Sequence, residues 1–157
     1  MVTVYILKEV FISWMIGHAS TLLLRAVISI GKLPQLNFIG NEKLNKLIGV
    51  GMCKWVLANS FIKYFNRELQ MPVKKPNASD LLELRDAMTY AETVHLIAFV
   101  YVIGRVLMNV AESEDPRVIV SLLAVNVLVN VYPALVQQMN KRRIGRLIQL
   151  ATTHNAG

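Results

Sequence analysis

The chain has 157 residues, of which 54% are hydrophobic, and its formal net charge is +7 at pH 7. Its mean hydropathy of +0.44 exceeds what water-soluble domains usually carry, and its length gives room for a single domain. The positive charge lies beside apolar stretches without an aromatic-basic motif, which excludes nucleic acid and favours membrane lipids as partners. One cysteine, Cys53, excludes a disulfide framework, and no metal-ligand spacing surrounds it, so we expect no metal site.

The first apolar segment, residues 10–30, contains only His18 and Arg25 as groups that can carry charge. Lys8 and Glu9 precede it, and its apolar run has no convincing small-residue cleavage site. We therefore expect a retained anchor helix that crosses the bilayer.

The second apolar segment, residues 44–65, carries Lys46, Lys54 and Lys63, and its apolar residues recur at helical spacing. Lysines at this density favour an amphipathic helix lying in the membrane interface, with Lys54 as an interfacial anchor. A short or re-entrant span is the alternative.

A polar linker, residues 66–86, follows, and Ser79 or Asp80 is expected to cap the helix that comes next. That helix contains the third apolar segment, residues 88–111, in which Arg105 is expected to reach the interface or Glu112.

An acidic turn then leads to the fourth apolar segment, residues 118–139, which has no charged side chain. At about 1.5 Å per residue it can cross a hydrocarbon core of about 30 Å. The third and fourth segments must form an antiparallel hairpin, because the turn between them is short.

Basic residues dominate the segment after the hairpin, residues 140–157, which we expect to be a cytoplasmic tail with frayed last residues. The protein is then an integral membrane protein with its C-terminus inside the cell, for which we expect the cytoplasmic membrane of a bacterium. The predicted fold is an all-α bundle of about three transmembrane helices and one amphipathic interfacial helix, in a single membrane domain over residues 1–157.

The fourth segment has a polar stripe, because its polar residues and one proline follow each other at spacings of 4, 3, 4 and 3. The stripe consists of Asn126, Asn130, Pro133, Gln137 and Asn140. Amides in membrane helices often serve only as hydrogen-bonding groups between helices, at about 0.6 kcal/mol each. A structural role for the amides of the stripe is therefore one interpretation.

Glu92 and His95 lie one turn apart in the third segment. A carboxyl group inside a membrane span costs about 2.5 to 3.5 kcal/mol, so such groups are usually functional or paired. Folding the hairpin about the acidic turn sets Glu92 level with Gln137 and His95 level with Asn130. We therefore expect a polar pocket near the cytoplasmic side of the membrane.

Two sequence blocks resemble a known family. Residues 91–95 read A-E-x-x-H, and residues 130–143 read N-V-x-P-x-x-x-Q-x-x-N-x-x-R. Both resemble the small bacterial membrane acyltransferases typified by glycosyl-4,4'-diaponeurosporenoate acyltransferase of carotenoid glycoside synthesis. The resemblance implies transfer of a fatty acyl group to a hydroxyl of a glycosylated or other amphiphilic lipid at the cytoplasmic face.

Acyl transfer to a hydroxyl needs a general base and hydrogen-bond donors for the developing oxyanion. We expect His95 to be the base and Glu92 to orient it. The stripe lacks serine and cysteine, which favours direct transfer over an acyl-enzyme intermediate. Acyl-coenzyme A is the expected donor, and no bound cofactor is expected. The expected substrate-binding residues are Asn130, Gln137, Asn140, Arg142, Arg143 and Arg146.

Two other functions fit the same pattern. A chain of this size has few walls for a two-substrate pocket, which favours a non-enzymatic small subunit of a larger membrane complex, with the stripe as its interface. A transporter or proton-relay component is the other alternative, and it is disfavoured because the polar residues stop near the cytoplasmic half. Each of these functions is compatible with a homo-oligomer.

Overall fold

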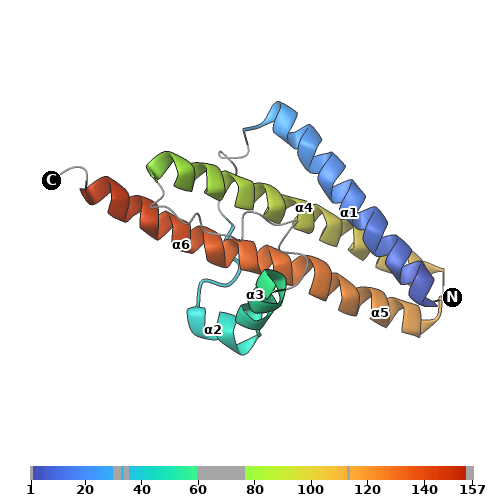
Figure 1. Cartoon of the computed structure of the whole chain (residues 1–157). Coiled ribbons are helices and arrows are strands. Elements are labelled where there is room, and N and C mark those ends of the chain that lie inside the picture. Colours follow the sequence, from blue (N-terminus) through green and yellow to red (C-terminus); the bar gives the residue numbers. More distant parts are fainter. Residues whose placement is uncertain (1, 30–32, 34–35, 60–76, 113, 155–157) are drawn as a thin grey trace. The chain divides into compact units, whose positions relative to one another are not determined.

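The computed structural model describes residues 2–29, 33, 36–59, 77–112 and 114–154, and every regular element in these ranges is a helix (Figure 1). The helices are α1 (Val2–Val27), α2 (Glu42–Leu47), α3 (Val50–Asn59), α4 (Ala78–Ala111), α5 (Pro116–Asn126) and α6 (Tyr132–His154). A π-helical turn, η4 (Val127–Val131), joins α5 to α6. The prediction of an all-α membrane bundle is confirmed.

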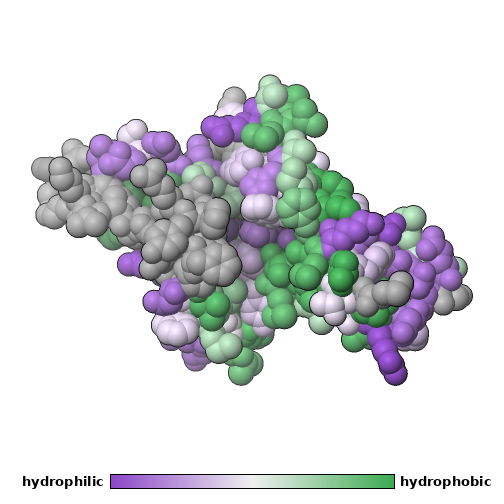
Figure 2. Space-filling view, turned by 45° about the vertical axis from the view of Figure 1, so that its right-hand side comes forward, coloured by the Kyte–Doolittle hydropathy of each residue, from purple (hydrophilic) through white to green (hydrophobic). Residues whose placement is uncertain are grey.

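Three helical stretches are long and apolar enough to cross a membrane: Val2–Val27, Ala78–Ala111 and Pro116–Leu150. Each overlaps one of the predicted spans. Large apolar side chains on them are exposed, such as Leu23 at 72% and Val100 at 67%. Figure 2 shows such hydrophobic surface in green on the face that it draws. Exposed apolar surface of this extent favours contact with lipid and indicates an integral membrane protein.

The chain divides into two compact units. The first unit comprises Met1–Ser29 and Glu92–Ala134, and the second comprises Ile30–Ala91 and Leu135–Gly157. Helices α4 and α6 each contribute residues to both units.

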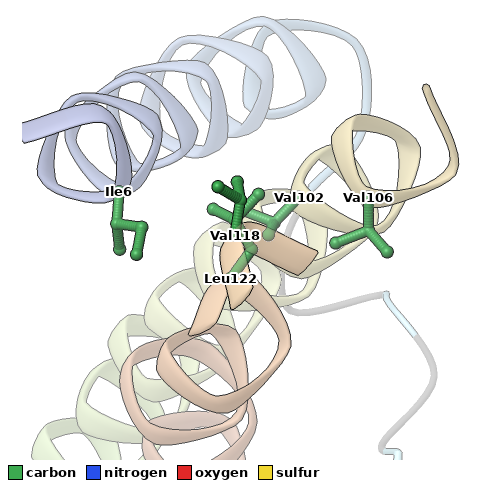
Figure 3. Packing of buried hydrophobic residues seen from close by; sticks show 5 residues of the cluster. All are labelled: Ile6, Val102, Val106, Val118 and Leu122. Carbon is green, nitrogen blue, oxygen red and sulfur yellow. The ribbon is translucent and has the colours of Figure 1, made fainter. Parts of the chain in front are cut away.

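In the first unit α1, α4 and α5 pack around a small apolar core. Figure 3 shows its five buried side chains, which come from all three helices. They are Ile6, Val102, Val106, Val118 and Leu122. Polar or small residues complete the buried face of α1 at four-residue intervals, namely Glu9, Ser13, Gly17 and Thr21. The small side chains let α1 approach α4 closely, and a Cβ added at Gly17 would lie 2.5 Å from the carbonyl oxygen of Val94.

Helix α1 begins at Val2, well before the predicted start at residue 10. The predicted start was wrong because a charged residue such as Glu9 normally lies outside a membrane span, so the prediction placed the start of the helix after it. In the structure its side chain is only 2% exposed and faces the other helices of the first unit.

In the second unit the N-terminal part of α4 packs on α6 through Leu81, Met88 and Ile144. The predicted cap of this helix was also wrong. Asn77, and neither Ser79 nor Asp80, occupies the cap position, since its Oδ1 accepts from the backbone N–H of Asp80 over 2.8 Å. The Asp80 carboxylate accepts in return from the N–H of Asn77 over 3.1 Å, which completes a capping box.

The segment predicted as one amphipathic helix over residues 44–65 contains two short helices, α2 and α3. They are separated at Gly49, whose φ of +78° is a conformation that glycine adopts at low cost. Residues 60–65 of that prediction, most of the predicted linker and residues 155–157 lie outside the described residues. The predicted frayed tail is helical as far as His154.

Candidate functional site

His95 lies on α4 in the first unit and meets the start of the polar stripe, as the depth argument predicts. Its Nδ1 is 3.5 Å from Oδ1 of Asn130, at the long end of the hydrogen-bond range. The imidazole also has a backbone hydrogen bond with Val129. The structure therefore surrounds the predicted base with hydrogen-bonding groups from the π-helical turn.

The irregular turn explains why the Val129 backbone is available. Pro133 has no N–H and cannot donate to the carbonyl four residues earlier, which is that of Val129. The next residue back, Tyr132, donates its N–H to the carbonyl of Val127, five residues away, and so forms the π-helical turn. Single π-turns of this kind are frequent at functional sites.

Asn130 and Asn126 form a buried pair behind His95. Asn126 and Asn130 are 1% and 3% exposed. Nδ2 of Asn130 donates to Oδ1 of Asn126 over 2.8 Å, and Nδ2 of Asn126 donates to the carbonyl oxygen of Phe99 over 3.3 Å. The first two residues of the predicted stripe, Asn126 and Asn130, thus form a hydrogen-bond chain that joins the fourth segment to the third.

The second predicted catalytic residue, Glu92, is also buried, with 2% of its surface exposed. Its expected partner Gln137 belongs to the second unit, so their contact stays a prediction. Gln137 is itself buried, and among the described residues its Oε1 has no hydrogen-bond partner. A buried carbonyl without a donor costs about 1 to 3 kcal/mol, so a ligand hydroxyl that donates there would be stabilised.

In the second unit the polar stripe continues into a basic region. Nζ of Lys54, on α3, donates to Oδ1 of Asn140 over 2.7 Å. Burial, and next the positive charge of Arg143, lower the pKa of the Lys54 ammonium group. Lys54 therefore lies beside two predicted substrate-binding residues, Asn140 and Arg143. The prediction of Lys54 as an interfacial anchor did not include these contacts.

Arg142 has a different setting from its neighbours on α6. Its guanidinium donates to the side-chain oxygen of Asn37 and, over 2.8 Å, to the carbonyl oxygen of Ile39. It therefore holds the loop before α2, although a guanidinium with five N–H groups keeps donors for an anion. Arg143 and Arg146 are surface-exposed residues of the same helix.

A polar cluster around the buried carboxylate of Glu9, at the other end of the first unit, was not predicted. Nε of Arg105 donates to Oε2 of Glu9 over 3.2 Å, and the hydroxyl of Tyr101 donates to the same oxygen over 3.0 Å. Nη2 of Arg105 donates to the hydroxyl of Tyr5 over 3.1 Å. Arg105 therefore pairs with Glu9 and Tyr5 instead of the expected Glu112, whereas its reach to the membrane interface stays a prediction. Glu9, Ser13 and Gly17 follow each other at four-residue spacing, and this is the sequence signal that could have placed Glu9 on the buried face.

Within the described ranges, no three histidine, cysteine, aspartate or glutamate side chains form a group that could hold a metal ion.

Comparison with known proteins identifies a family for this chain. The family model of glycosyl-4,4'-diaponeurosporenoate acyltransferase matches residues 10–150, which is most of the chain. The matched region includes His95, the π-helical turn and the basic part of α6. No curated protein and no solved structure matches the chain. The chain belongs to the glycosyl-4,4'-diaponeurosporenoate acyltransferase family, whose acyltransferases take part in carotenoid glycoside synthesis.

Proposed function

We propose that this protein transfers a fatty acyl group from acyl-coenzyme A to a hydroxyl of a glycosylated or other amphiphilic lipid at the cytoplasmic face of a bacterial membrane. Membership of an acyltransferase family supports the reaction class. The observation that carries the proposal is the contact of His95 with Asn130, since it sets an imidazole among buried amides within a candidate membrane-spanning helix.

The reaction proposed needs no enzyme nucleophile. His95 takes the proton of the acceptor hydroxyl while the hydroxyl oxygen bonds to the acyl carbonyl carbon. The carbon–sulfur bond of the thioester then breaks, and the proton passes to the leaving thiolate. Products are an ester and free coenzyme A, so atoms and charges balance.

The remaining predicted residues bind the two substrates in this proposal. Oε1 of Gln137, which has no hydrogen-bond partner among the described residues, accepts from a hydroxyl of the acceptor sugar. Arg143, together with Lys54, binds a phosphate of the donor, because two neighbouring cations are stabilised by an anion between them. Arg142 and Arg146 supply further positive charge, and Glu92 supports the imidazole of His95.

The proposal is tested with purified protein in liposomes, radiolabelled acyl-coenzyme A and a glycosylated carotenoid acid as acceptor. We expect label to move from the aqueous phase to the lipid fraction as an alkali-labile ester, and one coenzyme A to be released per ester. No transfer to any of a panel of glycosylated and plain hydroxylated lipids would contradict the proposal and support a non-catalytic subunit.

A further inference from the structure

The hydrogen-bond chain behind His95 has a fixed direction because it ends on a backbone carbonyl. A carbonyl oxygen can only accept, so the group of Asn126 that faces Phe99 must be its NH2. The side chain of Asn126 then turns its oxygen the other way. Nδ2 of Asn130 lies 2.8 Å from this oxygen and donates a hydrogen bond to it.

The orientation of the Asn130 amide is fixed in the same way, and it decides which group faces His95. An amide that turns its NH2 toward Asn126 presents its oxygen on the opposite side, where Nδ1 of His95 lies at 3.5 Å. An amide oxygen cannot donate, so a hydrogen bond between the two requires the hydrogen on Nδ1. A neutral imidazole has one N–H, and the backbone carbonyl of Val129 is a second acceptor for it, so the tautomer depends on which of the two acceptors takes the hydrogen.

We propose that Asn126 and Asn130 are positioning residues that hold His95 as the neutral Nδ1–H tautomer and leave the lone pair of Nε2 to take the proton of the acceptor hydroxyl. This inference rests on the proposed acyl transfer for its consequence, whereas the tautomer itself does not depend on activity. The chain runs from Phe99 through Asn126 and Asn130 to His95, and it is confined to the first unit.

The other interpretation of the two asparagines is that they only hold α4 to the following helix. Both interpretations predict a loss of stability when either residue is replaced. They differ in the protonation of the imidazole, because a purely structural pair leaves the single hydrogen of the ring available to the carbonyl of Val129 instead of Oδ1 of Asn130.

Nitrogen-15 NMR of histidine-labelled protein in lipid bilayers distinguishes them. His18, His95 and His154 are the three histidines, and the spectrum of a His95→Gln variant identifies the His95 signals by difference. Above the pH at which the ring titrates, we expect Nδ1 of His95 to be protonated and Nε2 to be bare. A bare Nδ1 with a protonated Nε2 in the wild-type protein would overturn the proposal without any variant having to fold.

Two variants test the direction of the chain. Asn130→Asp keeps an acceptor for His95, so we expect the Nδ1–H signal to persist. Asn126→Leu removes the anchor to Phe99 and frees the amide of Asn130 to rotate, so we expect a mixture of tautomers and a fall in kcat of about tenfold or more, with KM little changed. An unaltered tautomer and kcat in Asn126→Leu would contradict the inference. Wild-type protein with the expected tautomer but no acyl transfer would refute only the proposed function.

Discussion

Arg105 donates from Nε to Oε2 of Glu9 over 3.2 Å, and this ion pair joins α4 to α1 across 96 residues of sequence. Glu9 is nearly fully buried and also accepts from Tyr101. In an apolar bundle each charge depends on the other, because an uncompensated buried charge is expensive. The pair therefore fixes the N-terminal half of α1 on the first unit.

We expect Arg105→Leu to destabilise the protein by about 3 to 5 kcal/mol, since it leaves the Glu9 carboxylate buried without its cation. The double variant with Glu9→Leu should regain part of that loss. Unfolding in detergent micelles measures both, with Arg117→Leu at an exposed arginine as the control. A double variant less stable than Arg105→Leu would contradict the interdependence of the two charges.

Gly17 tests how closely α1 and α4 pack. A Cβ on Gly17 would lie 2.5 Å from the Val94 carbonyl oxygen, so Gly17→Ala must move one helix and should lower the unfolding temperature. Gly104→Ala is the matched control, because no atom of the described residues lies within 4 Å of its added Cβ. That control should be neutral or stabilising by up to about 1 kcal/mol through helix propensity. Equal effects of the two substitutions would show that the helices are not in close contact at Gly17.

Lys54 should respond to the charge beside it. Burial, and next the charge of Arg143, lower the pKa of Lys54, so Arg143→Gln should raise that pKa and shift the labelling of Lys54 by amine-directed reagents to higher pH. Mass spectrometry of labelled peptides measures the midpoint, with Arg146→Gln as a control of equal charge change. Coenzyme A bound between the two cations should also raise the pKa and slow the labelling. Labelling that neither Arg143→Gln nor coenzyme A alters would argue against a phosphate site there.

The basic residues after the hairpin predict a cytoplasmic C-terminus. A reporter fused after Gly157 should be active in the cytoplasm, and a cysteine placed at Glu114 in a Cys53→Ser background should react with an impermeant thiol reagent from outside. Both residues flank the same candidate span, Pro116–Leu150. A C-terminus outside the cell and Glu114 inside it would contradict the proposal, because the reaction would then take place at the outer face, where acyl-coenzyme A is absent.

Much of the fold follows from hydrophobic periodicity, which locates the three apolar helices and the buried stripe. The contact of His95 with Asn130 follows as well, because a short turn fixes the register of an antiparallel hairpin. Periodicity says nothing of partners distant in sequence, so it could not pair Lys54 with Asn140 or Glu9 with Arg105. It also misread local signals, since a buried charge at Glu9 resembles a helix boundary and the break at Gly49 lies within an apolar run.

The turnover of His95→Ala, measured in liposomes with labelled acyl-coenzyme A, tests the central claim most directly. His154→Ala, outside the family-matched residues 10–150, is the control with one histidine removed. We expect kcat to fall by about 10² to 10⁴ in His95→Ala, with the unfolding temperature little changed, and to stay at the wild-type level in the control. Wild-type turnover in folded His95→Ala protein would contradict the assignment of His95 as the base.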